Sequence, residues 1–184
     1  MTNQGFDEKN VLQGCLKNDL RSQKLLYERY RISMFTLCLR YATDRAEAED
    51  MLQDGFIQVF KEMHQYDSSK GVFEGWMRRV IINVALQLIR KKKMSFVEMN
   101  DSQLQISSDE DVVSSMSLKE LLAHIQKLPT GYRTVFNLYV IDGLQHNEIA
   151  EMLNISINTS KTQLFKAKQL LKKAITDSQL VTAY

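Results

Sequence analysis

Apolar residues recur every three or four positions through most of the chain, the spacing that places side chains on one face of an α-helix. Before residue 95 the pattern predicts helices over residues 10–17, 21–40, about 44–64 and 71–93. The apolar positions of the first two are mainly Leu25, Leu26, Ile32, Met34, Phe35, Leu37, Cys38 and Leu39. The third has an inner face of Leu52, Phe56, Val59, Phe60 and Met63, and the fourth one of Phe73, Met77, Val80, Ile81, Val84 and Leu88.

Residues 144–173 have the most informative pattern, because it predicts two helices joined by a tight turn. Asn154 lies where the chain must turn, since Asn tolerates left-handed backbone angles, and Ser156 is placed to cap the next helix. The expected inner side of that helix is Ile157, Leu164, Ala167, Leu170, Leu171 and Ala174. Its outward candidates are Asn158, Thr159, Lys161, Thr162, Gln163 and Lys166.

The second of these helices is basic, with five lysines and no Asp or Glu between Lys161 and Lys173. Lysine, hydroxyl and amide side chains bind phosphates or base edges, so the segment has the outline of a helix-turn-helix that places one helix against DNA. An ordinary helical hairpin with a solvated lysine face is the alternative interpretation.

Charge divides the chain into three parts. Residues 96–115 contain Ser and five Asp/Glu but no Lys or Arg, which is typical of a flexible acidic linker. Residues 1–95 carry sixteen Lys/Arg against twelve Asp/Glu, and residues 116–184 carry eight against five. With one proline and seven glycines in 184 residues, the sequence predicts an all-α fold of two small helical domains, residues 1–95 and 116–184, joined by that linker.

Two polar stripes in the first domain suggest binding surfaces. On the third predicted helix a 3-4-4 spacing groups Glu47, Asp50, Asp54 and Gln58, which suits docking on a basic protein partner or is a plain solvated face. On the fourth, a spacing of four groups Arg79, Asn83, Gln87 and Lys91. Phe73 and Trp76 stand at the start of that helix and Arg90–Lys93 at its end, and such aromatic, amide and cationic groups suit unstacked bases. A core role for Trp76 is the alternative.

Other chemistries find little support in the sequence. Cys15 and Cys38 form neither a disulfide framework nor a metal cluster and indicate reduced, buried thiols of a cytoplasmic protein. His64, His124 and His146 are scattered, and His146 suits a packing or phosphate contact. We find no nucleophile–base arrangement, no Gly-rich phosphate loop, no metal-ligand spacing, no signal peptide and no long apolar span. We therefore expect no catalytic activity, no metal, no cofactor and no membrane insertion.

Taken together, these segments resemble the extracytoplasmic-function (ECF) sigma factors of the bacterial sigma-70 family. The resemblance covers roughly residues 7–175. It is carried by AEDMLQDGFIQVF (48–60), FEGWMRRVIINVALQLIRKKK (73–93), LPTGYRTVFNLYVIDGL (128–144) and EIAEMLNIS (148–156). The segment KTQLFKAK (161–168) is most similar to sigma factors of the Bacteroidetes.

The resemblance implies a factor that brings core RNA polymerase, through its β and β′ subunits, to promoter DNA. Residues 1–95 correspond to sigma region 2, and the implied docking residues are Glu47, Asp50, Gln53, Asp54 and Gln58. The implied −10 contacts are Ser69, Lys70, Phe73, Trp76, Arg79, Asn83, Gln87, Arg90 and Lys91. Residues 116–184 correspond to region 4, with −35 contacts implied at Ser156, Asn158, Thr159, Lys161, Thr162, Gln163 and Lys166. A further implied partner is an anti-sigma factor anchored in the membrane.

Three positions depart from the pattern of that family. Gln87 stands where Asp is common, Ser160 where Val is common, and Gln145 where Ser or Thr is common, which leaves the promoter sequence open. Two other classes also remain open from the residues: a helix-turn-helix repressor or activator that binds duplex DNA alone, and a protein-binding inhibitor whose acidic helix mimics DNA. Neither explains the segments 48–60, 73–93 and 144–173 together.

Overall fold

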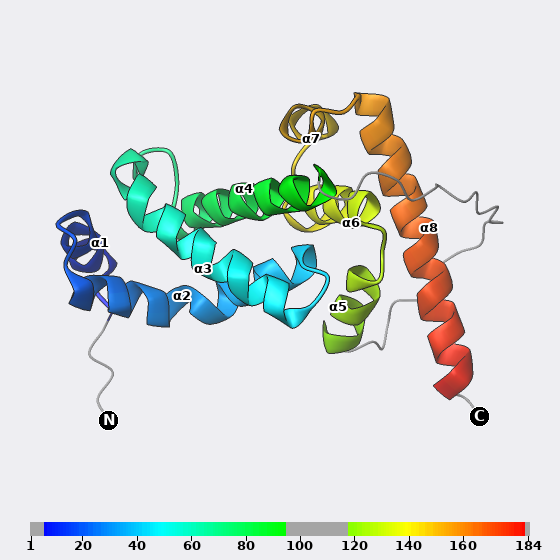
Figure 1. The fold of residues 1–184 in the computed structure, drawn as a ribbon, viewed down its shortest axis with the longest axis horizontal. Coiled ribbons are helices and arrows are strands. Elements are labelled where there is room, and N and C mark those ends of the chain that lie inside the picture. The colour runs from blue at the N-terminus through cyan, green and yellow to red at the C-terminus, as the bar shows by residue number, and fades with distance from the viewer. Residues whose placement is uncertain (1–5, 95–117, 183–184) are drawn as a thin grey trace. The chain divides into compact units, whose positions relative to one another are not determined.

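The computed structural model describes residues 6–94 and 118–182, which consist of helices and short connections (Figure 1). The chain divides into two compact units, unit 1 (Met1–Ser95) and unit 2 (Phe96–Tyr184). The predicted all-α fold is thereby confirmed, while the predicted linker, residues 96–115, lies outside the described residues. Within the described segments, no helix has both the length and the apolar character needed to cross a bilayer.

Unit 1 contains four α-helices and one 3₁₀ turn among its described residues. They are α1 (Glu8–Leu16), α2 (Leu20–Tyr41), α3 (Arg45–Glu62), the 3₁₀ turn η1 (Met63–Gln65) and α4 (Phe73–Met94). The first three helices begin alike: the carboxylates of Asp7, Asp19 and Asp44 each accept a hydrogen bond from the backbone N–H three residues later. Such caps satisfy N–H groups that a helix start leaves without a partner. Local sequence therefore fixes where these helices begin.

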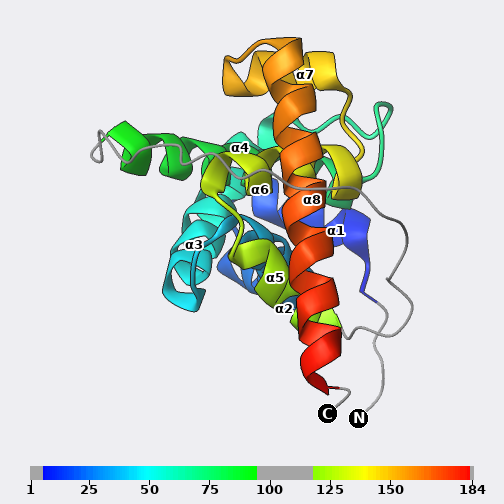
Figure 2. The same ribbon diagram turned by 90° about the vertical axis from the view of Figure 1, so that its right-hand side faces the viewer.

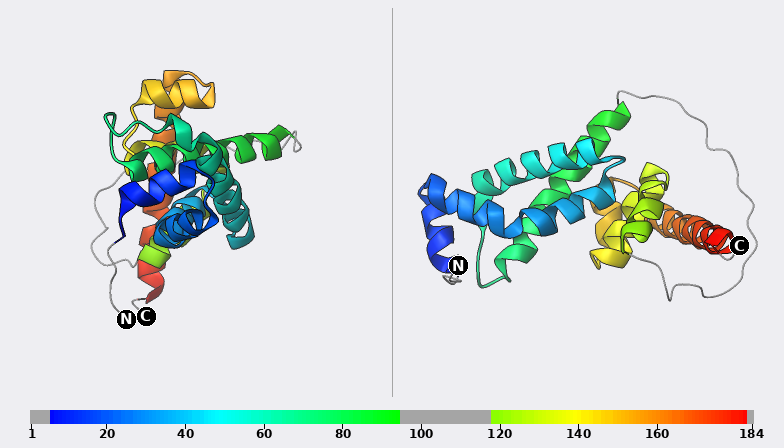
Figure 3. Two further views of the ribbon diagram at one scale, coloured as in Figure 1. Left: turned by 90° about the vertical axis from the view of Figure 1, so that its left-hand side faces the viewer. Right: turned by 90° about the horizontal axis from the view of Figure 1, so that it is seen from below.

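Helix α3 packs between α2 and α4, and α1 packs on α2 near one end (Figures 1 and 3). Fully buried side chains from the three long helices fill the space between them, among them Leu26, Met34, Leu37, Met51, Val59, Met77 and Ile81. Gly55 lets α3 approach α4 closely, because a Cβ there would lie 3.0 Å from Ile81. Packing in the core therefore leaves one face of α3 and one face of α4 exposed to solvent.

Two apolar positions expected in the core of the first domain lie at the surface instead. Leu25 is 43% exposed and Ile32 is 69% exposed. The buried stripe of α2 runs through Leu26, Tyr30, Met34, Leu37 and Tyr41, at intervals of three and four residues. At about 100° per residue, Leu25 and Ile32 lie about 100° and 120° around the helix from Leu26, the nearest member of that stripe, so they point away from the core.

Unit 2 is a second helical core. Its described elements are α5 (Leu118–Gln126), α6 (Thr130–Phe136), the π-helical turn η2 (Asn137–Ile141), α7 (His146–Leu153) and α8 (Ile157–Thr182). Helix α8 packs on α5, α6 and α7, as Figure 2 shows. Ile125, Leu128, Ala167 and Leu171 form the buried cluster between α5 and α8. Leu164, Ala167 and Leu171, three of the inner positions predicted for α8, are therefore buried. Ile157, a fourth, is 46% exposed because it is the first residue of the helix.

The turn between α7 and α8 forms as its residues predict. Asn154 adopts the left-handed conformation with φ 53° and ψ 50°, and the N–H of Ile155 donates to the carbonyl of Ala150 at 3.0 Å. The hydroxyl of Ser156 accepts from the N–H of Thr159 at 2.9 Å, which caps α8. At the start of α7 the carboxylate of Glu148 accepts from the N–H of Gln145 at 2.7 Å. Unit 2 therefore presents a helix-turn-helix with both helix starts satisfied.

Candidate protein and nucleic-acid interfaces

The predicted docking residues on α3 fall into two groups. Asp50, Gln53 and Asp54 are exposed, and none of their side chains is engaged by a hydrogen bond or ion pair from the described residues. Glu47 accepts from the backbone N–H of Thr43 at 2.7 Å, and Gln58 donates to Glu62 at 2.6 Å. The structure therefore leaves the first three available to a partner, whereas Glu47 and Gln58 hold local structure.

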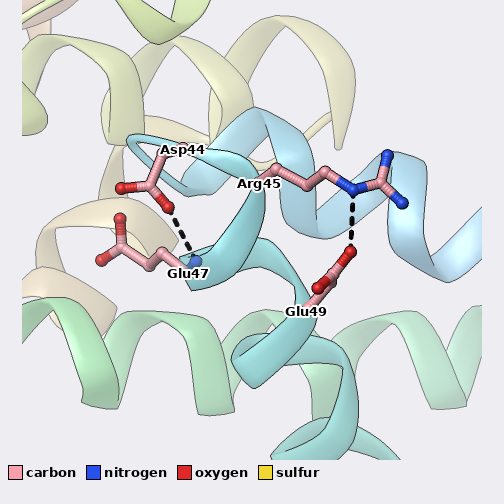
Figure 4. Close-up of polar contacts among 4 residues, drawn as sticks. All are labelled: Asp44, Arg45, Glu47 and Glu49. Carbon is pink, nitrogen blue, oxygen red and sulfur yellow. Dashed lines mark hydrogen bonds and ion pairs between the residues drawn. The ribbon is translucent and has the colours of Figure 1, made fainter.

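The start of α3 holds its other charges in local contacts (Figure 4). Asp44 caps the helix through the N–H of Glu47 at 2.9 Å, and the Nε of Arg45 lies 2.8 Å from the carboxylate of Glu49. The guanidinium of Arg45 also lies over the ring of Phe35, 5.1 Å from its centroid. These contacts leave the exposed and unengaged negative charge of α3 at Asp50 and Asp54, about 100° and 140° around the helix from Glu49.

Helix α4 separates an apolar face from a polar one, as its sequence predicts. Phe73, Met77, Val80, Ile81 and Val84 are buried, and Leu88 is half-buried. The stripe at intervals of four residues is exposed throughout, namely Arg79, Asn83, Gln87 and Lys91. The structure therefore presents these four side chains along a single exposed face.

An aromatic cluster stands at the start of α4. The ring of Phe73 lies 5.5 Å from Trp76 and 5.2 Å from Tyr66, and Tyr66 lies 5.7 Å from Trp76. Phe73 is 0% exposed, so it is the buried member of the cluster. It presents no ring face to DNA, contrary to its implied role. Trp76 is half-buried and retains accessible surface. Tyr66, which the sequence alone did not single out, is fixed by donating from its hydroxyl to the carbonyl of Gly71.

The loop before α4 is organised by an acid that the sequence alone did not single out. Asp67 accepts from both the backbone N–H of Ser69, at 2.9 Å, and its hydroxyl, at 2.7 Å. These hydrogen bonds lower the pKa of Asp67, so it is ionised. The ammonium of Lys70 lies 3.8 Å from the same carboxylate. Ser69 and Lys70 are both exposed, and Asp67 sets the shape of the loop that presents them.

On α8 the predicted DNA-facing residues lie on one side of the first three turns. Asn158, Lys161, Thr162 and Lys166 are exposed, while Thr159 and Gln163 are half-buried. Gln163 lies toward α6, since a Cβ placed on Gly131 would be 3.4 Å from its amide. The ammonium of Lys166 lies over Tyr132 of α6, 5.7 Å from the ring centroid. The polar side of α8 is therefore continuous with the start of α6.

Phe165 joins this polar side of α8, although the sequence analysis did not assign it. It is 61% exposed and is flanked by buried Leu164 and exposed Lys166. The helical period could have found it, because burial of Leu164, Ala167 and Leu171 turns position 165 outward. An exposed aromatic ring on a DNA-facing helix can contact a thymine methyl.

Ser160, by contrast, is turned inward. It is 0% exposed, and its hydroxyl lies 2.9 Å from Nδ1 of His146 on α7. The ring of His146 stacks on Tyr139, with centroids 4.4 Å apart and planes inclined by 23°. His146 is therefore a packing residue, one of the two roles expected for it. Burial, with the positive charges of Lys161 and Lys168, lowers its pKa below the usual 6.5.

This lowered pKa predicts how the stability of unit 2 depends on pH. Below pH 6.5 the unfolded chain takes up a proton at His146 more readily than the folded chain does. The free energy of unfolding should therefore fall as the pH drops through 6.5 toward the lower pKa of the folded state. Urea unfolding followed by NMR signals from α7 and α8 reports unit 2 separately. His146→Phe keeps a ring beside Tyr139 and cannot titrate, so its slope should be smaller; an unchanged slope would contradict this assignment.

Neither cysteine lies at these surfaces. Cys15 and Cys38 are buried and free, and burial raises the pKa of Cys15 to about 11 and that of Cys38 to about 12. Both thiols are therefore protonated near neutral pH. In the described part of the chain, no group of three His, Cys, Asp or Glu residues is placed to hold a metal ion.

Two sequence profiles of one family match the chain, Sigma-70 region 2 over residues 26–94 and Sigma-70 region 4 over residues 118–171. The chain is also 34% identical over 182 residues to the ECF RNA polymerase sigma factor SigW of Bacillus subtilis (strain 168). That alignment covers 92% of this chain and 97% of SigW. The chain belongs to the ECF sigma factors. As such it is a non-enzymatic factor of transcription initiation, as the resemblance implies.

Other relatives agree with this sigma factor over most of its length. It is 29% identical to the ECF RNA polymerase sigma factor SigM of Bacillus subtilis (strain 168), over 80% of this chain and 91% of SigM. Among solved structures, the sigma factor RpoE of Bartonella quintana, in complex with the anti-sigma factor NepR, has a TM-score of 0.54 at 15% identity. That match covers 83% of this chain and 96% of RpoE and shows the fold alone.

The two matched regions exclude the alternatives that the residues left open. A helix-turn-helix regulator that acts alone requires no region 2, and an inhibitor that mimics DNA requires no basic recognition helix. The chain has both a region 2 and a region 4, in the order found in sigma factors.

Proposed function

We propose that this sigma factor divides its work between three exposed faces. The first is the acidic face of α3, where Asp50, Gln53 and Asp54 dock on the coiled coil of the largest subunit of core RNA polymerase. The observation that supports this assignment is that the three side chains are exposed and unengaged by the described residues, whereas neighbouring Glu47 and Glu49 are held locally. A basic partner surface would attract the two unpaired carboxylates.

The second face is the polar stripe of α4, which captures the non-template strand at the −10 element. Asn83 and Gln87 bond base edges, and Trp76 offers the accessible edge of an aromatic cluster. Cationic and hydroxyl groups contact the phosphates: Ser69 and Lys70 from the loop before α4, and Arg79, Arg90 and Lys91 from α4 itself. Opening each base-pair step costs about 1.4 kcal/mol of stacking, and each captured base returns about 1–3 kcal/mol. A few captured bases therefore suffice to hold a short bubble.

The third face is the first three turns of α8, which enter the major groove at the −35 element. Ser156 caps the helix, and Asn158, Thr159, Thr162 and Gln163 supply groups for base edges or phosphates. Lys161 and Lys166 bind phosphates, and Phe165 adds an apolar contact. The continuity of this side with α6, through Gln163 and Lys166, supports a footprint that extends onto the adjacent phosphates.

We further propose an anti-sigma factor as the regulatory partner and the cytoplasm as the site of action. RpoE of Bartonella quintana was solved with the anti-sigma factor NepR, and this chain shares its fold. A partner of this kind would cover the α3 and α4 faces and thereby prevent assembly with polymerase. Residues 96–115, with their five acids, would lie along a basic channel of the polymerase.

Run-off transcription tests the proposal. Core RNA polymerase is supplied with linear templates that carry candidate promoters, with and without the full-length chain. Transcripts that depend on both the chain and a promoter are the expected result. Tight binding to duplex DNA without core polymerase, together with no stimulated transcript, would refute the proposed division of work.

The lysines of α8 predict a specific salt dependence. The affinity for DNA falls as salt rises, and replacing Lys161 and Lys166 by Gln should make this fall less steep. The slope of log affinity against log salt should become less negative by about 2, because each phosphate contact releases about 0.9 counterions. The loss should be similar for all duplex sequences, since phosphate contacts carry no base information. Fluorescence anisotropy of the full-length chain on a labelled duplex, over a salt series, measures the slope. Lys172→Gln with Lys173→Gln removes the same charge farther along α8 and should change the slope less; equal slopes would refute the assignment.

A further inference from the structure

The start of the recognition helix is joined to α7 by a partly buried polar contact. Ser160 is fully buried although both its neighbours, Thr159 and Lys161, belong to the DNA-facing set. Its hydroxyl lies 2.9 Å from Nδ1 of His146, the first residue of α7. Val at position 160 could make only apolar contact there. The hydrogen bond therefore depends on the residues that this chain has at positions 146 and 160.

His146 is itself held from the other side. Its ring stacks on Tyr139 at 4.4 Å, and Tyr139 lies in the π-helical turn Asn137–Ile141. That turn is closed by two backbone hydrogen bonds of 2.9 Å, from Asp142 to Asn137 and from Leu144 to Leu138. A π-helical turn fits one more residue than an α-helical turn and so shifts the side chains that follow it. Tyr139, His146 and Ser160 therefore form a continuous series of contacts from η2 through α7 to α8.

We infer that Ser160 and His146 are positioning residues, which fix the rotation of α8 about its axis through their hydrogen bond and thereby set which base edges the exposed residues reach. This inference rests on the −35 role proposed for α8. A rotation of about 20° would move a side-chain tip, about 5 Å from the helix axis, by about 2 Å. That displacement exceeds the range over which a hydrogen bond to a base edge survives.

A hydrogen bond suits this purpose better than an apolar contact does. Apolar packing is non-directional, so Val at position 160 tolerates small rotations of one helix against the other. The buried hydroxyl of Ser160 and the half-buried imidazole of His146 lose a partner when either helix rotates, and leaving a buried polar group unpaired is costly. Rotating α8 away from the orientation in which this hydrogen bond forms therefore costs free energy. In this way Ser160 affects the promoter preference without touching DNA.

A matched pair of substitutions separates this role from simple packing. Ser160→Thr and Ser160→Val add the same volume, but only Thr keeps a hydroxyl for His146. Ser160→Ala adds no atom and removes the hydroxyl, and His146→Phe keeps the stack on Tyr139 and removes the nitrogen. Each full-length variant is assembled with core RNA polymerase. The holoenzyme then transcribes templates with a randomised upstream element and the −10 element that the wild-type protein selects. Sequencing of the transcribed templates ranks the upstream sequences.

We expect Ser160→Thr to keep the wild-type ranking. The ratio of transcription from preferred to disfavoured upstream sequences should fall by about five-fold in each of Ser160→Val, Ser160→Ala and His146→Phe. About five-fold is the factor that a neutral hydrogen bond is worth. The double variant Ser160→Ala with His146→Phe should lower this ratio no further than either single change. If the Val and Thr variants rank sequences alike while the wild-type protein discriminates, the positioning role is refuted. If the wild-type protein ranks all sequences equally, the −35 role of α8 fails and the inference fails with it.

Discussion

Reversing the charges of Asp50 and Asp54 to Lys should weaken binding to core RNA polymerase by about a hundred-fold or more. Both carboxylates lie on the exposed face of α3, and neither is engaged by the residues that the structure describes. Removing one partner of a charge pair that the interface buries costs about 2–5 kcal/mol, and reversal adds repulsion to that loss. The dissociation constant of the full-length chain for core polymerase, measured at two salt concentrations, tests this expectation.

A control with the same change in net charge makes the test specific. Glu28→Lys with Glu49→Lys also adds four positive units, but these exposed acids already have ion-pair partners, Lys24 at 3.9 Å and Arg45 at 2.8 Å. Glu49 also lies about 140° around α3 from Asp54. Exposed ion pairs contribute little to stability, so this variant should fold and bind core nearly as well as the wild-type chain. Equal loss in both variants would show that net charge, and not the α3 face, governs docking.

What the sequence predicts correctly here is mostly local. The left-handed conformation of Asn154 and the cap by Ser156 depend on residues one to three positions away, and both form as expected. The exposed stripe of α4 also follows from its period, because a long helix with one buried face turns Arg79, Asn83 and Gln87 outward together.

What the sequence does not predict depends on how helices cross. Ser160 seemed to be a place where base preference would vary, yet the packing of α7 on α8 turns it inward against His146. Phe73 seemed a stacking platform, yet Tyr66 and Trp76 pack against it and leave it no exposed surface. A one-dimensional pattern gives the angle of a residue around its own helix, but not which neighbouring helix lies at that angle.

The same limit applies to the charged positions of α3. Glu47 and Gln58 share the helical period of Asp50 and Asp54, so the sequence places all four on one docking surface. The structure shows Glu47 bonded to Thr43 and Gln58 bonded to Glu62. Period alone cannot separate a carboxylate that closes a helix start from one that is available to a partner.

Replacing Asn83 by Ala should reduce open-complex formation by about ten-fold while leaving core binding within about two-fold. Asn83 is exposed at the middle of the α4 stripe, one helical turn from both Arg79 and Gln87, and its amide is placed to bond a base edge. A bidentate amide–base contact is worth about 1–3 kcal/mol. Asn83 lies on the face of α4 away from the buried core, so the substitution should not affect folding. Permanganate reactivity of unpaired thymines in the holoenzyme–promoter complex measures opening.

Two comparisons decide what Asn83 contributes. Gln13→Ala removes an exposed amide from α1, away from the stripe, and should leave opening unchanged. A template with a pre-opened, mismatched bubble removes the cost of melting but keeps the capture of bases. Because the proposed role is capture of bases, the holoenzyme with Asn83→Ala should still hold the pre-opened template more weakly than the wild-type holoenzyme does. Full recovery there would show that Asn83 acts only on strand separation, and equal loss of core binding and opening would remove it from the DNA-binding face altogether.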